Sequence, residues 1–434
     1  MISTQPQWEP AQLPECGSPA RWDWLQQLRR QSELDPEPWL QALENGSLSL
    51  APDLLSVLAE RLDPPSQRRL LRWWRKQPDP DPGLPSQVLR HRDGASADLL
   101  LQELAPGPAA LGLALPHVVA LALLPLLGHQ RKAAAWPVLL SWMRAPIATP
   151  LRHAALEGIA RGLSVWPRLQ LVAGLSALAV DLDPQLAAPA VDLLARLPGA
   201  RRALVPLQRC PLDPEVAERL GRRLAATPAH PLLLVVHGRS GGELPEELVS
   251  LAAELEHRRG APVRLQALSA VAPPEPQQLA LGNQLLTLVP LLLLPGGHVR
   301  HDLPAIVRHW SAFTRVQHWP FLGAWPCWHT ALATELAGLN MQASRPLLLH
   351  HPLEGPLAAR YLGSLERRIG AQCVATPYSA EHLAKLKLTL ASPALALALA
   401  ANRLTDELAE QVGPPLLQRP CLRQLLLAEL EALP

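Results

Sequence analysis

The sequence is poor in cysteine, and its cysteines are not grouped. The chain has 434 residues, of which five are cysteine. None forms a Cys-x-x-Cys pair, so a disulfide framework is not expected. A reducing compartment fits this pattern best, and we therefore expect a cytoplasmic protein. The cysteines are Cys16, Cys210, Cys327, Cys373 and Cys421.

The chain also lacks an excess of charge of either sign. Its formal net charge is only +2, from 40 Lys and Arg against 38 Asp and Glu. Binding to nucleic acid needs a concentrated basic face, and none is visible, so we expect no nucleic-acid partner. The first residues are polar and lack the basic start and apolar stretch of a signal peptide.

One uncharged stretch, Ala109–Leu127, is long enough to be compared with a membrane span. Pro116, His117 and Pro125 interrupt it, and no polybasic flank orients it. We interpret it as two buried helices of a repeat array and expect no membrane partner.

Helical patterns fill the first half of the chain after a tail, residues 1–20. Residues 21–226 contain four Leu-Asp-Pro triplets, beginning at Leu34, Leu62, Leu182 and Leu212. The first two begin 28 residues apart and the last two 30 residues apart. Asp before Pro favours a helix start, because the carboxylate caps backbone N–H groups and proline suits the first helical position. The pattern resembles loose HEAT or armadillo repeats, with an irregular helical domain as the alternative.

From about Pro228 the sequence pattern changes, and strand-like runs alternate with helical ones. This alternation predicts βαβ units with a parallel sheet. The fold class predicted is thus an all-α, HEAT-like domain followed by two α/β lobes, residues 227–325 and 340–434. The predicted strands are Leu232–Val236, Val263–Leu268, Leu285–Leu294 and Ala371–Ala375, and the predicted helices are Leu244–Arg259, Pro276–Gln284, Leu303–Phe313 and Leu357–Ile369.

Two of the apolar runs lead into a histidine beside glycine. Pro231–Val236 leads into His237-Gly238, and Leu288–Leu294 leads through Pro295-Gly-Gly into His298. Ligand groups in open α/β sheets sit just past the carboxyl ends of the strands, so we expect both imidazoles in one site. Neutral imidazole suits cobalt and iron, and its ordinary pKa near 6.5 lets it accept a proton.

At these residues the chain resembles the sirohydrochlorin chelatases, the class II chelatases of the CbiX and SirB kind. That family has an apolar strand followed by His-Gly-Ser, matched here at His237-Gly238-Arg239-Ser240. Its second signature, Leu-Leu-Pro-Gly-Gly-His-Val followed by Asp-Ile-Pro, is matched by Leu293–Val299 with Asp302-Leu-Pro304. The resemblance covers roughly residues 228–410.

The resemblance implies a lyase that inserts Co²⁺ or Fe²⁺ into sirohydrochlorin, for cobalamin or siroheme biosynthesis, with no nucleotide and no further cofactor. It implies that His237 and His298 are metal ligands and proton acceptors. We expect Arg239, Arg300 and His301 to meet the carboxylates of the tetrapyrrole. The remaining residues expected to contact the substrate are Gly238, Ser240, Gly296 and Gly297.

The second lobe looks like a degenerate copy of the first. Pro346–Pro352 echoes the first run, with Pro352 opposite His237 and His351 one position off. Asn402 stands where the second histidine would be, judged by Asp406 and Asp302. A further departure is Ser269, which replaces the glutamate common in the family.

The sequence leaves three functions open. The first is an active chelatase whose helical half docks a protein partner. The second is a chelatase-like protein that holds tetrapyrrole or metal without efficient insertion, which the serine at position 269 favours. The third is a helical-repeat scaffold. The choice between cobalt and iron also stays open, because imidazole binds both. We interpret Cys327 and His329 as buried residues near aromatics rather than a metal pair.

Overall fold

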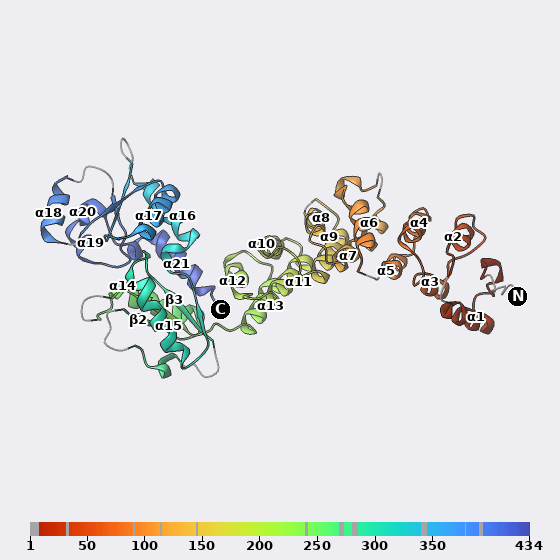
Figure 1. The fold of residues 1–434 in the computed structure, drawn as a ribbon, viewed down its shortest axis with the longest axis horizontal. Helices are drawn as coiled ribbons and strands as arrows, with labels where there is room; N and C mark the ends of the chain where they lie inside the picture. The colour runs from red at the N-terminus through yellow and green to blue at the C-terminus, as the bar shows by residue number, and fades with distance from the viewer. Residues whose placement is uncertain are drawn as a thin grey trace. The chain divides into compact units, whose positions relative to one another are not determined.

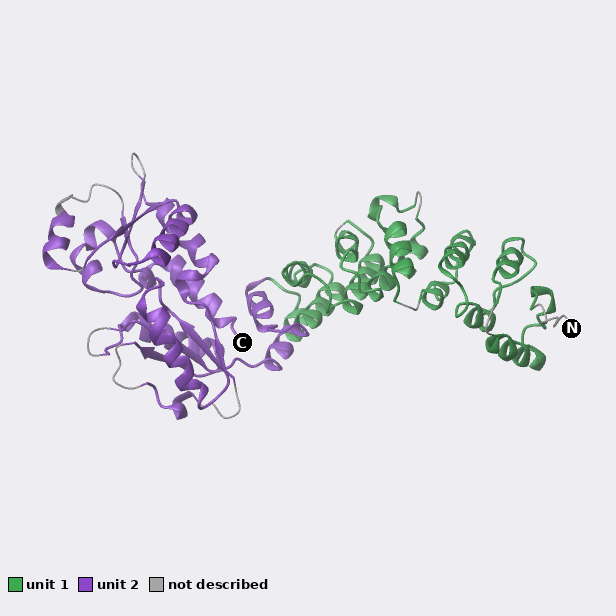
Figure 2. Ribbon diagram, in the orientation of Figure 1, with its two compact units in different colours: residues 1–194, 211–219 green, residues 195–210, 220–434 purple. Residues whose placement is uncertain are grey.

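The computed structural model describes most of the chain, in two compact units (Figure 2). One unit comprises Met1–Leu194 with Pro211–Arg219, and the other comprises Ala195–Cys210 with Leu220–Pro434. The described residues are 8–31, 34–89, 92–112, 115–144, 146–238, 242–268, 273–279, 285–339, 345–377, 379–389 and 394–434.

The first unit is helical, as predicted (Figure 1). Its elements are η1 (Pro10–Gln12), α1 (Pro19–Arg30), α2 (Glu37–Glu44), α3 (Pro52–Leu58), α4 (Pro64–Arg75), α5 (Leu84–Val88), α6 (Gly94–Leu104), η2 (Gly107–Ala110), α7 (His117–His129), α8 (Ala135–Met143), α9 (Thr149–Arg161), α10 (Arg168–Ala179), α11 (Pro184–Ala195) and the first part of α13 (Pro214–Ala225).

The four Leu-Asp-Pro triplets start helices α2, α4, α11 and α13, as predicted. In each triplet the aspartate carboxylate accepts a hydrogen bond from a backbone N–H at the beginning of the helix, which offsets the missing intrahelical acceptors. The N–H···O distances are 3.0 Å at Asp35, 2.9 Å at Asp63, 2.9 Å at Asp183 and 2.9 Å at Asp213.

Helices of the first unit pack against every second neighbour. Helix α3 contacts α1 and α5, α5 contacts α7, and α7 contacts α9. In the same way α4 contacts α2 and α6, and α6 contacts α8. Two rows of helices result, which is the packing of stacked helical pairs. The specific likeness to HEAT or armadillo repeats stays a prediction.

The uncharged stretch Ala109–Leu127 does not form two helices. Its described part contains the end of the 3₁₀ turn η2 and then most of one buried helix, α7, whose interior carries Pro125. Among the described residues, no helix combines the length and the apolar character needed to cross a membrane.

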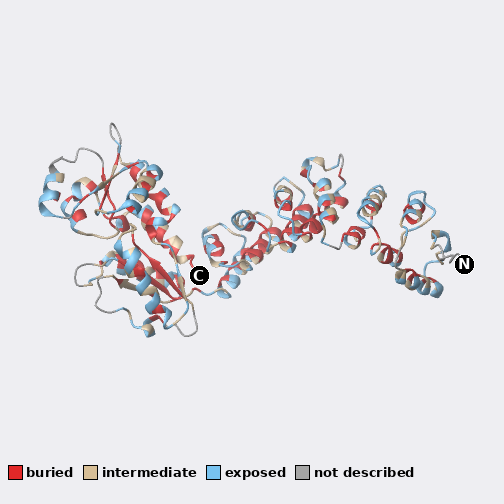
Figure 3. Ribbon diagram, viewed as in Figure 1, coloured by how far each residue is buried: buried red, intermediate tan, exposed pale blue. Residues whose placement is uncertain are grey.

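The second unit contains two parallel sheets. One has the order β2-β1-β3-β4 and the other the order β6-β5-β7. Strands β1 and β3 are buried along their whole length, as expected for strands covered on both faces (Figure 3). The strands are β1 (Leu232–Val236), β2 (Val263–Ala267), β3 (Leu286–Pro290), β4 (Val316–His318), β5 (Leu347–His350), β6 (Gln372–Ala375) and β7 (Ala394–Ala396).

Helices and turns surround these sheets. The short elements α12 and η3 lie against α21, where Arg202 pairs with Glu429 at 2.9 Å and Arg209 with Glu431 at 2.5 Å. The elements are α12 (Arg201–Leu204), η3 (Val205–Arg209), α14 (Glu246–Arg259), η4 (Pro276–Leu279), η5 (His298–Asp302), α15 (Leu303–Ser311), η6 (Leu322–Ala324), α16 (Pro326–Gly338), α17 (Pro356–Ile369), α18 (Ala380–Thr389), α19 (Arg403–Glu407), α20 (Ala409–Val412), η7 (Leu416–Gln418) and α21 (Pro420–Glu431).

The two lobes repeat one structural unit. Helix α14 ends in the left-handed Gly260 and leads into β2, while α17 ends in the left-handed Gly370 and leads into β6. In both lobes the last turn of the helix carries a glutamate whose carboxylate accepts a backbone N–H from the strand. The pairs are Glu256 with Val263 (3.1 Å) and Glu366 with Cys373 (2.8 Å). The same contact at the same spacing supports a duplication.

Two element predictions need correction, and two elements were not predicted. The strand predicted over Leu285–Leu294 ends at Pro290, which cannot donate to a ladder, although the apolar run continues. The described part of the helix predicted over Pro276–Gln284 is the 3₁₀ turn η4, and residues 280–284 lie outside the described residues. Strand β4, at the edge of the first sheet, and helix α16, which follows the first lobe, were not predicted.

One hydrophobic core joins the two lobes. It gathers side chains from the first lobe, from the second lobe and from α16 and α21, including Val289, Trp328, Leu348 and Leu426. These side chains are buried, so the lobes pack as parts of one body.

Candidate functional site

The strand order of the first sheet brings two carboxyl ends together at a reversal in topology. The chain passes from β1 to β2 on one side, and β3 then pairs with β1 on the other side. Ligands of open α/β sheets bind at such a switch point. His237 directly follows β1, and His298 follows the loop that leaves β3.

The two imidazoles meet there, in accordance with the sequence prediction. Their ring centroids lie 4.9 Å apart and the ring planes are nearly perpendicular, at 88°. Both histidines are exposed, so a dissolved ion and a large substrate can reach them. Two histidines 61 positions apart in the sequence are thus brought together.

Hydrogen bonds select the ring nitrogen that can bind a cation. In His298, Nδ1 lies 2.5 Å from Oδ2 of Asp302, and in His237, Nδ1 lies 3.2 Å from the carbonyl oxygen of Gly238. Both partners accept, so each Nδ1 carries a proton, and in the neutral form of each ring the lone pair is on Nε2. A carboxylate behind a metal-binding histidine also orients the ring and makes it more basic.

The separation of the rings fits a shared metal ion. Two imidazoles that each give one nitrogen to a metal at about 2.1 Å place their ring centres about 4.5–5.2 Å apart. The observed 4.9 Å lies within this interval. Among the described residues, no group of three or more His, Cys, Asp or Glu side chains is arranged to hold a metal. A two-nitrogen site of this kind binds an ion loosely, which suits transfer better than storage.

The neighbouring glycines differ in what they do. Gly238 has φ +68°, a conformation that side chains other than glycine's rarely adopt, so the chain can turn directly after His237. A Cβ atom on Gly297 would meet no atom within 4 Å, whereas one on Gly296 would lie 3.5 Å from the side chain of Leu353. The backbone before His298 is therefore open on one side and packed against the second lobe on the other.

The other residues predicted for the site are partly described. Arg300 and His301 are exposed on the π-helical turn η5, directly after His298. Arg239, Ser240 and Ser269 lie outside the described residues. Cys327 is half-buried, and burial raises the pKa of its thiol. The pKa of His329 is lowered by burial, because desolvation disfavours the charged ring.

The second lobe keeps the strand ends but not the pair. Strand β5 is one residue shorter than β1, so counted from the strand end His351 stands where His237 does. Asn402 caps helix α19 instead, since its side chain accepts the backbone N–H of Thr405 at 3.1 Å. The position that matches His298 thus has a structural use.

Sequence reasoning missed the contacts that three residues make around the site. Asp302 served there only as a marker for alignment, although its spacing of four from His298 on a helical turn signals a contact. Tyr361 contacts the loop of His298 from α17, and no local signal in the sequence indicates this contact. His329 was interpreted as a buried residue, but its bond to the carbonyl of Gly323, beside that loop, has no local signal either.

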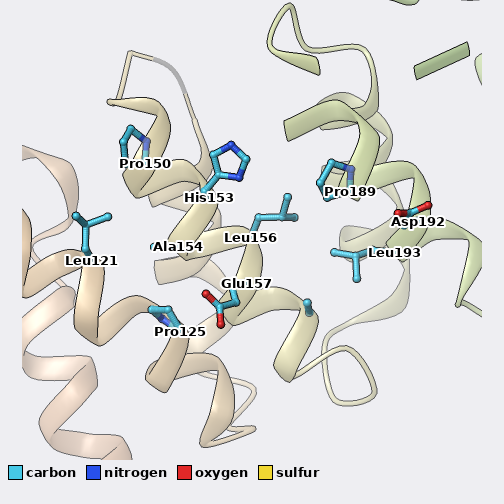
Figure 4. A pocket seen from close by; sticks show the side chains of 11 residues that line it. Leu121, Pro125, Pro150, His153, Ala154, Leu156, Glu157, Pro189, Asp192 and Leu193 are labelled. Atoms are coloured by element: carbon cyan, nitrogen blue, oxygen red, sulfur yellow. The ribbon is translucent and has the colours of Figure 1, made fainter. Parts of the chain in front are cut away.

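The first unit has a groove of about 610 Å³ between helices α7, α9 and α11 (Figure 4). Its walls are mostly leucine, alanine and proline, with His153, Glu157 and Asp192 among them. Glu157 pairs with Arg161 and Asp192 with Arg219, so both acids are ion-paired. This groove offers no catalytic constellation.

Comparison with known proteins agrees with this geometry. Residues 231–350 match the family model described as CbiX. The C-terminal part of the chain is CbiX-like. The match begins at β1, includes both histidines and ends at β5. No curated protein and no solved structure matched the chain. The CbiX match indicates a class II chelatase-like domain, the kind that inserts metal ions into tetrapyrroles.

Proposed function

We propose that the second unit is a sirohydrochlorin chelatase that inserts Co²⁺ or Fe²⁺ into the tetrapyrrole, for cobalamin or siroheme biosynthesis. The observation that carries the proposal is the meeting of His237 and His298 at the switch point of a CbiX-like sheet, with ring centroids 4.9 Å apart. The metal ion is a substrate here, and the reaction uses no nucleotide and no resident cofactor.

The two histidines have successive tasks in this reaction. Each Nε2 first gives its lone pair to the divalent ion. When the ion passes to the four pyrrole nitrogens, two N–H protons leave the macrocycle, and the same lone pairs accept them. The charge balances, since one doubly charged cation enters the ring and two protons leave it. Asp302, hydrogen-bonded to Nδ1 of His298, stabilises the imidazolium that forms.

Cationic residues at the mouth hold the substrate. Sirohydrochlorin carries carboxylates around its rim, and Arg300 and His301 stand exposed beside His298. We assign them, with Arg239, to carboxylate binding, because guanidinium pairs with carboxylates in a bidentate manner. Gly238, Ser240, Gly296 and Gly297 complete the proposed contact surface. We propose that the helical unit docks a protein partner and that the reaction takes place in the cytoplasm.

The second candidate function is binding without efficient insertion. The observation that favours it is Ser269, where the resemblance leads us to expect a glutamate. A site with one acid fewer binds a cation less strongly and has one proton acceptor fewer.

The absorbance of the tetrapyrrole distinguishes the two candidate functions, metal insertion and binding without insertion. Full-length protein is mixed with sirohydrochlorin and Co²⁺ or Fe²⁺ without nucleotide, and insertion is followed in the visible range. We expect a rate well above the spontaneous one and a loss of about 100-fold or more in His298→Ala. The control is His382→Ala, which removes an exposed histidine from α18. A wild-type rate equal to the spontaneous one refutes insertion, and tetrapyrrole binding that persists then supports the second candidate.

A further inference from the structure

The loop that carries His298 is fastened from the second lobe. The hydroxyl of Tyr361, on α17, lies 3.0 Å from the carbonyl oxygen of Leu293 and 2.7 Å from that of Gly323. Leu293 is five residues before His298, and Pro295 stiffens the segment between them. Residues distant in the sequence therefore fix the backbone immediately before the metal site.

Gly323 is the centre of this contact. Its backbone N–H donates to the carbonyl of Leu292 at 2.9 Å, and its own carbonyl accepts from both Tyr361 and Nε2 of His329 (2.7 Å). A Cβ on Gly323 would lie 1.9 Å from the carbonyl oxygen of Leu293. The turn η6 thus approaches the loop as closely as backbone atoms allow.

The protonation state of His329 is fixed by its surroundings. The carbonyl of Gly323 can only accept and the guanidinium of Arg368, 3.3 Å from Nδ1, can only donate. Nε2 therefore carries the proton, and the ring is neutral. Burial lowers the pKa of His329, and Arg368 adds to the effect. Burial also raises the pKa of Tyr361, which keeps its hydroxyl a neutral donor.

We propose that Tyr361 and His329 are positioning residues that hold the loop Leu292–Gly297 so that His298 faces His237. The second lobe, which lacks the paired histidines, thereby sets the geometry of the metal site in the first. The consequence for metal insertion rests on the proposed function, whereas the fastening itself rests on the hydrogen bonds. The loop's geometry matters because a displacement of about 1 Å can cost two orders of magnitude in rate.

A purely structural role predicts a different pattern. If these hydrogen bonds only stabilise the packing of the lobes, removing one lowers the free energy of unfolding and leaves the ring pair as it is. If they position the loop, the separation of the rings and the affinity for metal change while the protein stays folded.

The test uses four variants of the full chain. Tyr361→Phe removes the hydroxyl, and His329→Ala removes the second donor to Gly323. His329→Gln keeps a donor where Nε2 was and serves as the rescue. The matched control is Thr376→Val, which removes another buried hydroxyl of the second lobe, bonded at 3.2 Å to Val374 and not to the loop.

Two measurements do not depend on catalysis. The first is the nuclear Overhauser effect between ring protons of His237 and His298 in histidine-labelled protein, which their 4.9 Å separation makes observable. The second is the affinity for Co²⁺ by calorimetry, with His298→Ala identifying the site. We expect Tyr361→Phe and His329→Ala to weaken the ring contact and to lower the affinity about 10-fold. His329→Gln and Thr376→Val should match the wild type.

Insertion kinetics give the third measurement. In Tyr361→Phe, kcat should fall about 10-fold while the KM for tetrapyrrole changes less than about 2-fold, because the carboxylate contacts are untouched. Unchanged ring contact and Co²⁺ affinity in both Tyr361→Phe and His329→Ala overturn the positioning role. If the wild type inserts no metal but the ring contact still depends on Tyr361, the chelatase proposal fails and the positioning role stands.

Discussion

The two α/β lobes share a sheet order and a helix-to-strand contact, yet they use equivalent positions differently. In the first lobe, the residues beyond β1 and β3 are His237 and His298, which meet. In the second lobe, His351 follows β5 and is exposed, while Asn402 caps a helix. A parallel sheet with this strand order supplies the edge, and a few residues decide whether the edge carries chemistry.

The two lobes also contribute differently to the site. In the second lobe, residues near the equivalent positions serve the structure: His350 is buried at the end of β5, and Thr405 completes the cap that Asn402 makes on α19. From this lobe Tyr361 reaches the loop of the first. The second lobe, which lacks the paired histidines, thus contributes to the site by bonding to the loop that carries His298 in the first lobe. The predictions below test that dependence.

The largest effect is expected where the turn η6 approaches the loop of His298 through backbone atoms, within the first lobe. Gly323→Ala places a Cβ 1.9 Å from the carbonyl oxygen of Leu293, and backbone cannot move aside as a side chain can. We expect a loss of about 3 kcal/mol in the free energy of unfolding by urea. The control Gly363→Ala, in α17, meets nothing nearer than 3.7 Å and should raise stability by about 0.5–1 kcal/mol. Equal stability of the two variants would mean that the fold does not depend on this close approach of the turn to the loop.

The second prediction compares the aspartates that follow the metal-site position in each lobe. Asp302 accepts from His298 at 2.5 Å, whereas Asp406 lies exposed in the first turn of α19. Asp302→Asn removes the charge behind the ligand, so affinity for Co²⁺ should fall about 10-fold. Asp406→Asn should leave it unchanged in the same calorimetric titration. An equal change of Co²⁺ affinity in both variants would show that the aspartate behind the histidine does not distinguish the first lobe from the second.

The third prediction tests the structural use of Asn402. Asn402→Ala removes the cap that Thr405 N–H needs, so the free energy of unfolding should fall by about 1 kcal/mol. Affinity for Co²⁺ should not change. Asn402→Ser retains a capping oxygen and should recover most of the loss. If Asn402→Ala instead weakens Co²⁺ binding, the second lobe takes part in metal binding directly.

How far the sequence predicts this arrangement depends on whether the signal is local. The histidine pair was predictable, because an apolar run ending at a glycine-flanked histidine marks a strand end, and parallel strand ends share an edge. The end of β3 was not predictable, because the apolar run continues past Pro290 although the pairing of β3 with β1 stops there. Tyr361 contacts the loop across 68 residues, and no pattern within α17 indicates it. Ser269, which stands where the family commonly has a glutamate, lies outside the described residues.

The smallest effect concerns pH and the buried histidine of the second lobe. Burial lowers the pKa of His350 below its usual 6.5, and Nδ1 donates to the carbonyl of His351 at 2.8 Å. The unfolded chain therefore binds a proton that the folded one does not, and the free energy of unfolding falls as the pH drops through 6.5. His350→Asn, which keeps a donor near Nδ1, should reduce this fall by less than about 1 kcal/mol between pH 7 and pH 6. Urea unfolding at several pH values measures this pH dependence of the free energy of unfolding.

The control Thr376→Val should lower or raise the free energy of unfolding equally at every pH, without changing its slope against pH, because no titrating group is lost. An unchanged slope in His350→Asn would show that the proton is taken up elsewhere, as at His329, whose pKa burial also lowers.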